Sequence, residues 1–190
     1  LVALLAVAAM QAQIIRVPDD YPTIQQGINA ATPGDTVLVS EGRYYEQINF
    51  AGKKPLMVAS LFLTDGDKNH IANTIIDGSQ IANSDSASVV YFSSGVDTTS
   101  VLCGFTITGG KGTTIITPDS IWGVARQGGG IWISGSGAKI RNNNITKNSC
   151  DGTLHAGAIC FNGGGIATDI TLEPKWIVVE NNIIDSNYLV

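Results

Sequence analysis

Two loops of this sequence carry the side chains best suited to chemistry, one at residues 111–127 and one at residues 149–162. Between them they hold an indole, a guanidinium, an imidazole and two carboxylates, on Asp119, Trp122, Arg126, Asp151 and His155. An indole can stack on a sugar ring, and Asp and Arg bind hydroxyls or a uronate carboxylate. An imidazole exchanges protons near neutral pH. These residue types predict a site for carbohydrate.

The predicted roles differ among the five residues. Substrate binding is assigned to Trp122, Asp119, Arg126 and His155, and the candidates for catalysis are His155, Arg126 and Asp151. Each also has a structural interpretation. Trp122 can pin its own loop to the scaffold, His155 can be an ordinary exposed residue, and Asp151 begins an Asp-Gly turn. The residue types alone leave both interpretations open.

The two loops occupy equivalent places in a repeated sequence. KIRNNNITKN at 139–148 returns 39 positions later as VVENNIIDSN, and VLCGFTITGG at 101–110 aligns with it at an offset of 38. GGGIWI at 128–133 returns 35 positions later as GGGIAT. Repeats of this length indicate structural units that stack. Stacking would bring the two loops side by side on one flank, joined by residues 78–87 one unit earlier.

The repeated positions also predict a core and a set of turns. Aliphatic residues recur at inward-facing positions, namely Leu102, Ile107, Ile140, Ile145, Val179 and Ile184. One unit cannot bury these side chains alone, so stacking supplies the stability. The aligned pairs Asn142/Asn181 and Asn143/Asn182 are expected at turns, because stacked amides form ladders and Asn accepts a left-handed backbone. The alternative for these asparagines is sugar binding.

The glycine runs at 128–130 and 163–165 have two interpretations. Phosphate-cradling loops are glycine-rich, but they lead into a helix, which neither run does. The alternative is a backbone that turns tightly into the following strand. We favour tight turns.

The N-terminal part predicts a different unit. Ile14–Val17 reads as a strand, and Thr23 can cap a helix whose apolar face is Ile24, Ile28 and Ala31. Further short strands are expected at Thr36–Ser40, Glu46–Phe50, Leu56–Ser60, Thr74–Asp77, Ser88–Phe92 and Val101–Ile107. These strands lie too close together for helical crossovers, so stacked parallel units are the remaining arrangement. An amphipathic helix at this point could cover the open end of the stack.

The stretch from Thr23 to Tyr44 fits the pattern T-I-Q-x-x-I-x-x-A-x-x-G-D-x-V-x-V-x-x-G-x-Y. This pattern resembles the N-terminal region of right-handed parallel β-helix proteins of the pectin-lyase-like superfamily, where it forms the capping helix and first coil. TIIDG, SVVYF and GFTITGG are similar to a pattern in secreted and surface β-helix proteins of bacteria. The resemblance implies an all-β fold over residues 13–190, a single-stranded right-handed parallel β-helix (a solenoid) with one short N-terminal capping α-helix.

The resemblance also frames the question of enzymatic activity. Polysaccharide lyases of this fold use calcium, several carboxylates and an Arg or Lys base, and glycoside hydrolases need two carboxylates at a set separation. Pectin methylesterases carry paired aspartates in motifs such as G-x-V-D-F-I-F-G, where this chain has GFTITGG and GGGIWISG. Asp77, Asp119, Asp151 and Asp185 stand apart from one another in the sequence. These departures argue against an esterase in this part of the chain.

One short segment suggests calcium. Asp65, Asp67 and Asn69 match the first half of a D-x-D-x-N calcium loop. Gly66 falls too early for that motif, and no Glu stands at the closing position. The alternative is a polar excursion between strands without a metal, and no other cofactor is expected.

Composition bounds the partners and the location. Charged residues are 14% of the chain, and 11 basic against 16 acidic residues give a net charge of −5. No basic cluster is visible, which excludes a nucleic-acid footprint. Residues 1–12 resemble the remnant of a signal peptide and are too short to span a membrane; the alternative is a buried N-terminal strand or helix. We therefore expect a secreted or cell-surface protein, continuing beyond this N-terminal part.

The three cysteines leave one over in any pairing. Cys103 lies in the apolar pattern VLCGF and is expected to be a buried free thiol. Cys150 and Cys160 flank one loop and could close it with a disulfide, or both could be unpaired thiols.

These observations favour a non-catalytic module that binds a polysaccharide or surface glycan, or acts in adhesion, through the loops 111–127 and 149–162. The alternative is an enzyme acting on acidic polysaccharide, a pectate-lyase-like lyase or a glycosidase. A second alternative is a purely structural stalk.

Overall fold

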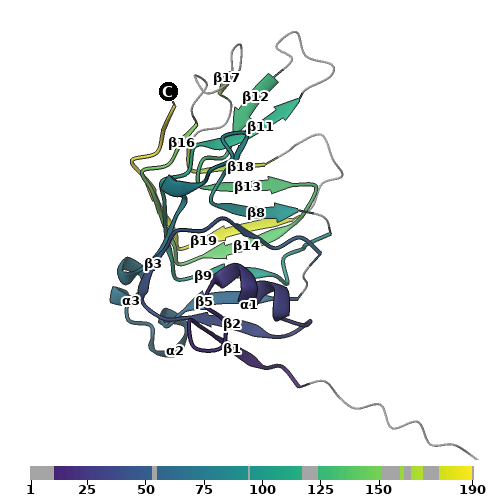
Figure 1. The fold of residues 1–190 in the computed structure, drawn as a ribbon, viewed down its shortest axis with the longest axis vertical. Coiled ribbons are helices and arrows are strands. Elements are labelled where there is room, and N and C mark those ends of the chain that lie inside the picture. The colour runs from purple at the N-terminus through teal and green to yellow at the C-terminus, as the bar shows by residue number, and fades with distance from the viewer. Residues whose placement is uncertain are drawn as a thin grey trace, which may run out of the picture.

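The computed structural model describes residues 11–52, 55–93, 95–116, 124–150, 159–160, 164–168 and 176–189. Within these residues the chain is an all-β protein built mostly of parallel sheets, with few and short helices (Figure 1). The longest sheet begins at the N-terminal end with β1 (Ile14–Val17) and proceeds through β2 (Thr36–Val39), β5 (Met57–Ser60), β9 (Val101–Cys103) and β14 (Ala138–Arg141) to β19 (Ile177–Glu180).

Two further parallel sheets follow the same order along the chain. One contains β3 (Gly42–Tyr44), β6 (Thr74–Asp77), β10 (Thr106–Thr108), β15 (Asn144–Thr146) and β20 (Ile183–Asp185). The other contains β4 (Ile48–Asn49), β8 (Val90–Ser93), β13 (Ile131–Ser134) and β18 (Ile166–Thr168). A short pair joins β16 (Ser149–Cys150) to β21 (Tyr188–Leu189). Each unit of the chain therefore contributes strands to several sheets in turn.

The register of these sheets confirms the sequence offsets. Ile140 pairs with Leu102 on one side and Val179 on the other, which are the predicted offsets of 38 and 39. Ile131 pairs with Ile166 at the offset of 35. Because a slip of one residue would turn every apolar side chain to the other face, the repeat spacing fixes the register.

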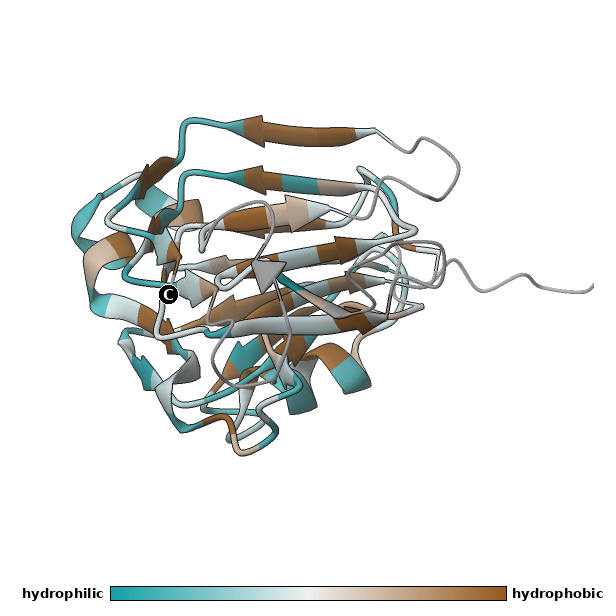
Figure 2. Cartoon of the chain, turned by 90° about the horizontal axis from the view of Figure 1, so that it is seen from above, coloured by the Kyte–Doolittle hydropathy of each residue, from teal (hydrophilic) through white to brown (hydrophobic). Residues whose placement is uncertain are grey.

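The predicted core keeps its register throughout, is fully buried in the earlier units and is partly exposed in the last described unit. Apolar residues concentrate on the strands (Figure 2), and Leu102, Ile107, Ile140 and Ile145 are fully buried. Val179 and Ile184 keep the predicted register but are 46% and 48% exposed. They lie on the last strands of their sheets, where no described strand follows them.

The asparagines form ladders, as predicted, but the two adjacent asparagines of each unit have different roles. Asn143 and Asn182 stack at one turn, with the Nδ2 of Asn143 donating to the Oδ1 of Asn182 at 3.1 Å. Asn142 and Asn181 do not extend the ladder; both have φ of 55° and provide the left-handed backbone of the turn. A second ladder joins Asn148 to Asn187, again at 3.1 Å. The amide pairs follow the 39-residue repeat.

The glycine runs serve close packing between successive units. A Cβ on Gly130 would lie 2.7 Å from the carbonyl oxygen of Gly165. A Cβ on Gly129 would overlap the carbonyl oxygen of Ser149. Their backbone groups are hydrogen-bonded, since Gly130 N donates to Gly164 O at 2.7 Å. Glycine is therefore required here by the approach of two backbones, in addition to the predicted tight turn.

The N-terminal helix α1 (Ile24–Ala30) forms as predicted. Thr23 caps it, with its Oγ1 accepting from the N–H of Gln26 at 3.2 Å. The carboxylate of Glu46 accepts from the first two backbone N–H groups of the helix, those of Ile24 and Gln25, both at 3.0 Å. The apolar face of α1 is buried in the main core together with residues of β1 and β2. Figure 1 shows α1 over the N-terminal end of the longest sheet.

The expectation of a single helix is wrong. Residues 62–73 form two more short helices, α2 (Phe62–Asp65) and α3 (Asn69–Asn73), and η1 (Gly78–Gln80) is a 3-10 turn. Gly66 ends α2 with φ of 77°, and its N–H donates to Phe62 O at 2.9 Å. A left-handed glycine at this position is a common helix ending.

Candidate functional site

The predicted flank exists as a sheet of four short strands. β7 (Ser86–Ala87) pairs antiparallel with β11 (Gly112–Ile116), which pairs antiparallel with β12 (Val124–Gln127). β12 in turn pairs in parallel with β17 (Ile159–Cys160). The described strands β7, β11, β12 and β17 of the segments predicted to emerge together, residues 78–87, 111–127 and 149–162, thus share one sheet, seen around β11, β12 and β17 in Figure 1. The prediction that they lie side by side is confirmed.

Four of the predicted site residues, Asp119, Trp122, Asp151 and His155, lie outside the described residues. Their roles in binding or catalysis stay predictions. The described residue of the set is Arg126, in β12.

Arg126 is fully buried at the base of the flank. Its Nη2 donates to the carbonyl oxygens of Ser84, Gly112 and Lys111 at 2.6, 2.6 and 3.2 Å, and its Nη1 donates to Thr114 Oγ1 at 3.0 Å. The guanidinium therefore clamps the segment around Ser84 to β11. It does not face solvent as a ligand-gripping group would, so its predicted contact with substrate has no support in this arrangement.

Cys150 and Cys160 are both neighbours of Arg126. Cys150 is buried, and its Sγ donates to the carbonyl oxygen of Arg126 at 3.0 Å. Cys160 is the register partner of Arg126 in β17. Because the side chain of Cys160 lies outside the description, the disulfide between them and the alternative of two unpaired thiols both stay predictions. Cys103 is a buried free thiol, as expected.

The calcium candidates are engaged with one another and with His70. Asp65 accepts from the N–H of Asp67 at 2.8 Å, and Asp67 accepts from the N–H of Asn69 at 2.9 Å. Within the described ranges, no group of three or more His, Cys, Asp or Glu is disposed to hold a metal ion. These three residues shape the α2–α3 excursion.

His70 bridges two carboxylates on the same side of the molecule. Its Nδ1 lies 2.7 Å from Glu41 Oε1 and its Nε2 lies 3.1 Å from Asp65 Oδ2. Partial desolvation of the ring opposes protonation, but the hydrogen bonds to Asp65 and Glu41 and the charges of these groups raise the pKa of His70 above its ordinary value. The bridge ties the α2–α3 excursion to the residue before β3, and no repeat or motif of the sequence indicated it.

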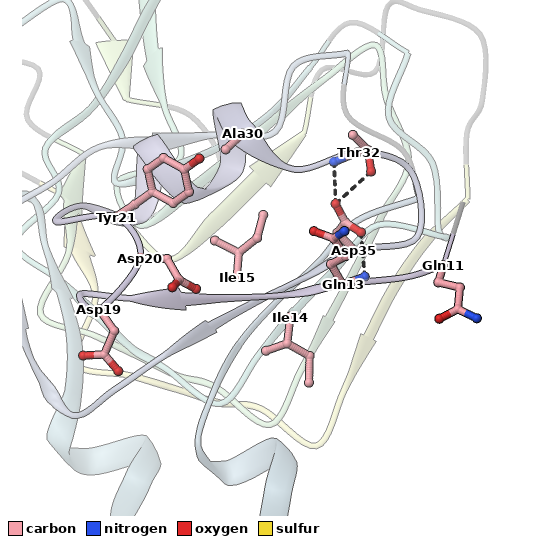
Figure 3. Close-up of a pocket in the computed structure, with 10 residues that line it drawn as sticks. All are labelled: Gln11, Gln13, Ile14, Ile15, Asp19, Asp20, Tyr21, Ala30, Thr32 and Asp35. Carbon is pink, nitrogen blue, oxygen red and sulfur yellow. Dashed lines mark hydrogen bonds between the residues drawn. The ribbon is translucent and has the colours of Figure 1, made fainter. Parts of the chain in front are cut away.

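A polar hollow at the N-terminal end was also missed. It measures about 800 Å³ and lies between β1 and α1, lined by Gln11, Gln13, Ile14, Ile15, Asp19, Asp20, Tyr21, Ala30, Thr32 and Asp35 (Figure 3). Amide and carboxylate groups beside the ring of Tyr21 are a chemistry that suits sugars. The hydrogen bond between Asp35 and Gln13, the residue before β1, joins positions 22 apart and gave no local sequence signal.

The buried carboxylate of this hollow is already in use. Asp35 accepts from Gln13 N at 2.8 Å and from the N and Oγ1 of Thr32 at 2.7 and 2.8 Å. The main-chain hydrogen bonds from Gln13 and Thr32 hold the pKa of Asp35 below its ordinary value. Asp20 accepts from Arg16 N at 2.7 Å. The remaining polar side chains are exposed, so this hollow is a less organised candidate than the flank.

Comparison with known proteins places the chain in a family. The family model described as "Protein of unknown function (DUF1565)" matches residues 18–189. The chain belongs to the DUF1565 family. No curated protein and no solved structure matches it. In the described part of this DUF1565 protein, no helix has both the length and the apolar character needed to cross a membrane.

Proposed function

We propose that this DUF1565 protein is a secreted or cell-surface module that binds a polysaccharide or surface glycan without turning it over. Its scaffold is a single right-handed parallel β-helix of the pectin-lyase-like type. The binding face is the flank formed by residues 78–87, 111–127 and 149–162. Export follows from the apolar run at residues 1–12.

The observation that carries this proposal is the flank sheet β7–β11–β12–β17. It gathers three segments, which are distant in the sequence, on one side of a stack of parallel sheets. Loops held by a rigid scaffold are the usual carriers of binding function, because the scaffold sets their spacing before a ligand arrives. The buried clamp of Arg126 adds to this order, since it fixes Ser84 and Gly112 at the base of two of the segments.

The residues of the loops supply the recognition chemistry. Trp122 would stack on a sugar ring, and Asp119 and His155 would hydrogen-bond its hydroxyls. The low content of charged residues leaves a surface rich in neutral hydrogen-bonding groups, which suits glycans. A second, less extended glycan contact at the Tyr21 hollow fits the same chemistry.

The test is a glycan array with the full chain, with Trp122→Ala and with Trp176→Ala. Trp176 is a matched control, because its side chain is 85% exposed and lies at the start of β19, in another sheet. Binding lost in Trp122→Ala and kept in Trp176→Ala supports the proposal, with thermal unfolding confirming that both variants fold. Equal binding by all three chains, or none by the full chain, overturns it.

The enzymatic alternative is separated by a second readout. Unsaturated uronate products are followed by absorbance with acidic polysaccharides, with and without calcium. Product formed by the full chain and lost in His155→Ala would replace the binding module by a lyase. Neither binding nor turnover would leave the structural stalk as the better account.

A further inference from the structure

One tyrosine hydroxyl joins the stack of parallel sheets to the flank. Tyr91 lies in β8, where its neighbours Val90 and Phe92 are buried in the main core and its own ring belongs to a separate cluster. Its hydroxyl makes hydrogen bonds with Ser86 Oγ of β7, at 2.8 Å, and with Thr113 Oγ1 of β11. Ser86 and Thr113 are register partners in the flank sheet. A single oxygen of the stack therefore holds two paired strands of the flank.

This contact belongs to a chain of four hydroxyls. Thr113 Oγ1 also lies 2.7 Å from Ser88 Oγ, so that Ser86, Tyr91, Thr113 and Ser88 form one hydroxyl cluster. Gln47 Nε2 donates to the carbonyl oxygens of Ser86 and Ser88, at 2.6 and 2.9 Å. Tyr91, Thr113 and Ser88 are buried. In a buried network each hydrogen bond is strong, and removing one member leaves another group unpaired.

An apolar contact lies beside the hydroxyl cluster. Trp132 pairs in register with Tyr91 on one side and with Ala167 on the other, and the three buried side chains form one cluster. Ile115 of β11 packs against that cluster. Because Thr113 and Ile115 are two residues apart on one strand, both side chains point to the same face of β11. The hairpin β11–β12 is thus seated on the stack by one polar and one apolar contact.

The clamp of Arg126 acts differently. Among the described residues, every hydrogen-bond partner of its guanidinium belongs to the flank itself: Ser84, Lys111, Gly112 and Thr114. Arg126 therefore ties the segments of the flank to one another, whereas Tyr91 ties the flank to the stack. The segment that connects β11 to β12, residues 117–123, holds Asp119 and Trp122. Both of its ends continue into the seated hairpin.

We propose that Tyr91 and Thr113 are positioning residues for the glycan site, because their hydroxyl contact sets the orientation of the hairpin β11–β12 on the stack. This inference rests on the proposed function, since it names residues that order the proposed binding face. Binding costs less free energy when a loop is already held in place. Loosening the hairpin would therefore weaken binding although neither residue contacts the sugar.

The test titrates four variants and the full chain over the glycan array and reads the half-saturating protein concentration at each glycan that the full chain binds. Tyr91→Phe removes the hydroxyl and keeps the ring. Thr113→Val removes the other hydroxyl and keeps the branched shape, and Thr113→Ser restores a hydroxyl in its place. Ile140→Val, in the buried core of β14, controls for lowered stability alone.

The half-saturating concentration is expected to rise about tenfold in Tyr91→Phe and in Thr113→Val. Thr113→Ser and Ile140→Val are expected to bind as the full chain does. The double variant Tyr91→Phe/Thr113→Val should bind no more weakly than either single variant, because both changes remove the same contact. Losses that multiply in the double variant, or a Thr113→Ser that binds as weakly as Thr113→Val, overturn the inference.

Amide hydrogen exchange separates positioning from general destabilisation. Faster exchange in Tyr91→Phe is expected in β11 and not in β13, because only the flank loses its seat. Equal acceleration in both strands overturns the inference, as does full binding by a variant whose β11 exchanges faster. No binding by the full chain overturns the proposed function and this inference together. Binding shared equally by all the chains overturns this inference alone.

Discussion

The first and the last described units of the chain differ in how their apolar residues are covered. At the N-terminal end, α1 buries Ile24 and Ile28 against the core and closes it. At the C-terminal end, the equivalent core column reaches Val179 and Ile184, and nearly half of each side chain is exposed. A repeat can bury its core only between neighbours, so an end needs a sequence that departs from the repeat.

The strand edges differ in the same way. The edge of β1 is occupied by the turn that follows it: Arg16 N donates to Asp20 Oδ2 at 2.7 Å, and Asp20 N donates to Arg16 O at 2.8 Å. Such contacts prevent another strand from adding at that edge. The edges of β19 and β20 have no comparable turn among the described residues. Of these three strand edges, the described residues therefore place a protecting turn at β1 alone.

The largest expected effect compares two isoleucines of one column, Ile145 and Ile184, which are register partners. Ile145→Ala empties a fully buried site and should lower the free energy of unfolding by about 2–5 kcal/mol. Ile184→Ala removes a side chain that is 48% exposed and should lower it by about 1 kcal/mol or less. Urea unfolding measures both. Similar losses would mean that the last unit is covered in solution.

The next comparison uses the ladder. Asn143→Ala leaves Phe105 N–H and Leu102 C=O unpaired in the interior, and the free energy of unfolding should fall by about 2–3 kcal/mol. Asn182→Ala should lower it by about 1 kcal/mol, because water reaches the end unit. Asn142→Ala serves as a control for the turn, since its left-handed backbone is strained without Asn. A larger loss at Asn182 than at Asn143 would contradict the ladder account.

These pairs also show what sequence alone could provide. The offsets of 38, 39 and 35 predicted the pairings of Ile140 and Ile131, because stacked units must keep apolar residues in register. Thr23 and the apolar spacing after it predicted α1, since a cap and a helical period are local signals. The flank followed from the equivalent places of its loops.

Other features depend on contacts that the sequence does not display. The burial of Arg126 depends on carbonyl groups of Ser84, Lys111 and Gly112, and any residue type supplies a carbonyl. The α2–α3 helices lie in an insertion without repeat spacing. The exposure of Ile184 depends on its being in the last described unit, which its sequence pattern shares with the buried Ile145.

A smaller effect is expected at the closed end. Thr23→Ala removes the Oγ1 that accepts from Gln26 N and should lower the free energy of unfolding by about 1 kcal/mol. Gln26→Ala is the matched control in the same helix; its side chain is exposed, and the change should be within about 0.5 kcal/mol of zero. Thermal unfolding compares the two variants with the parent chain. Equal stability of Thr23→Ala and the parent would show that Glu46 alone caps α1.

The smallest expected effect is a pH dependence at the same end. Main-chain hydrogen bonds from Gln13 and Thr32 lower the pKa of Asp35 in the folded protein relative to its ordinary value of 3.8. A carboxyl with a lowered pKa stabilises the folded state above the unfolded pKa, and that contribution disappears as the pH falls through the folded pKa. The urea midpoint should therefore decline as the pH is lowered from about 5 to 3.

The control for this prediction is Asp35→Asn. Asparagine cannot ionise. Its NH₂ group would take the place of a carboxylate oxygen that accepts from Thr32 N and Thr32 Oγ1, so two donors would face each other and this variant should be less stable than the parent at pH 7. Its urea midpoint should fall less steeply between pH 5 and 3, because other carboxyls, such as Asp77, retain their own lowered pKa. Parallel curves for the two chains would show that Asp35 does not govern the acid stability of the closed end.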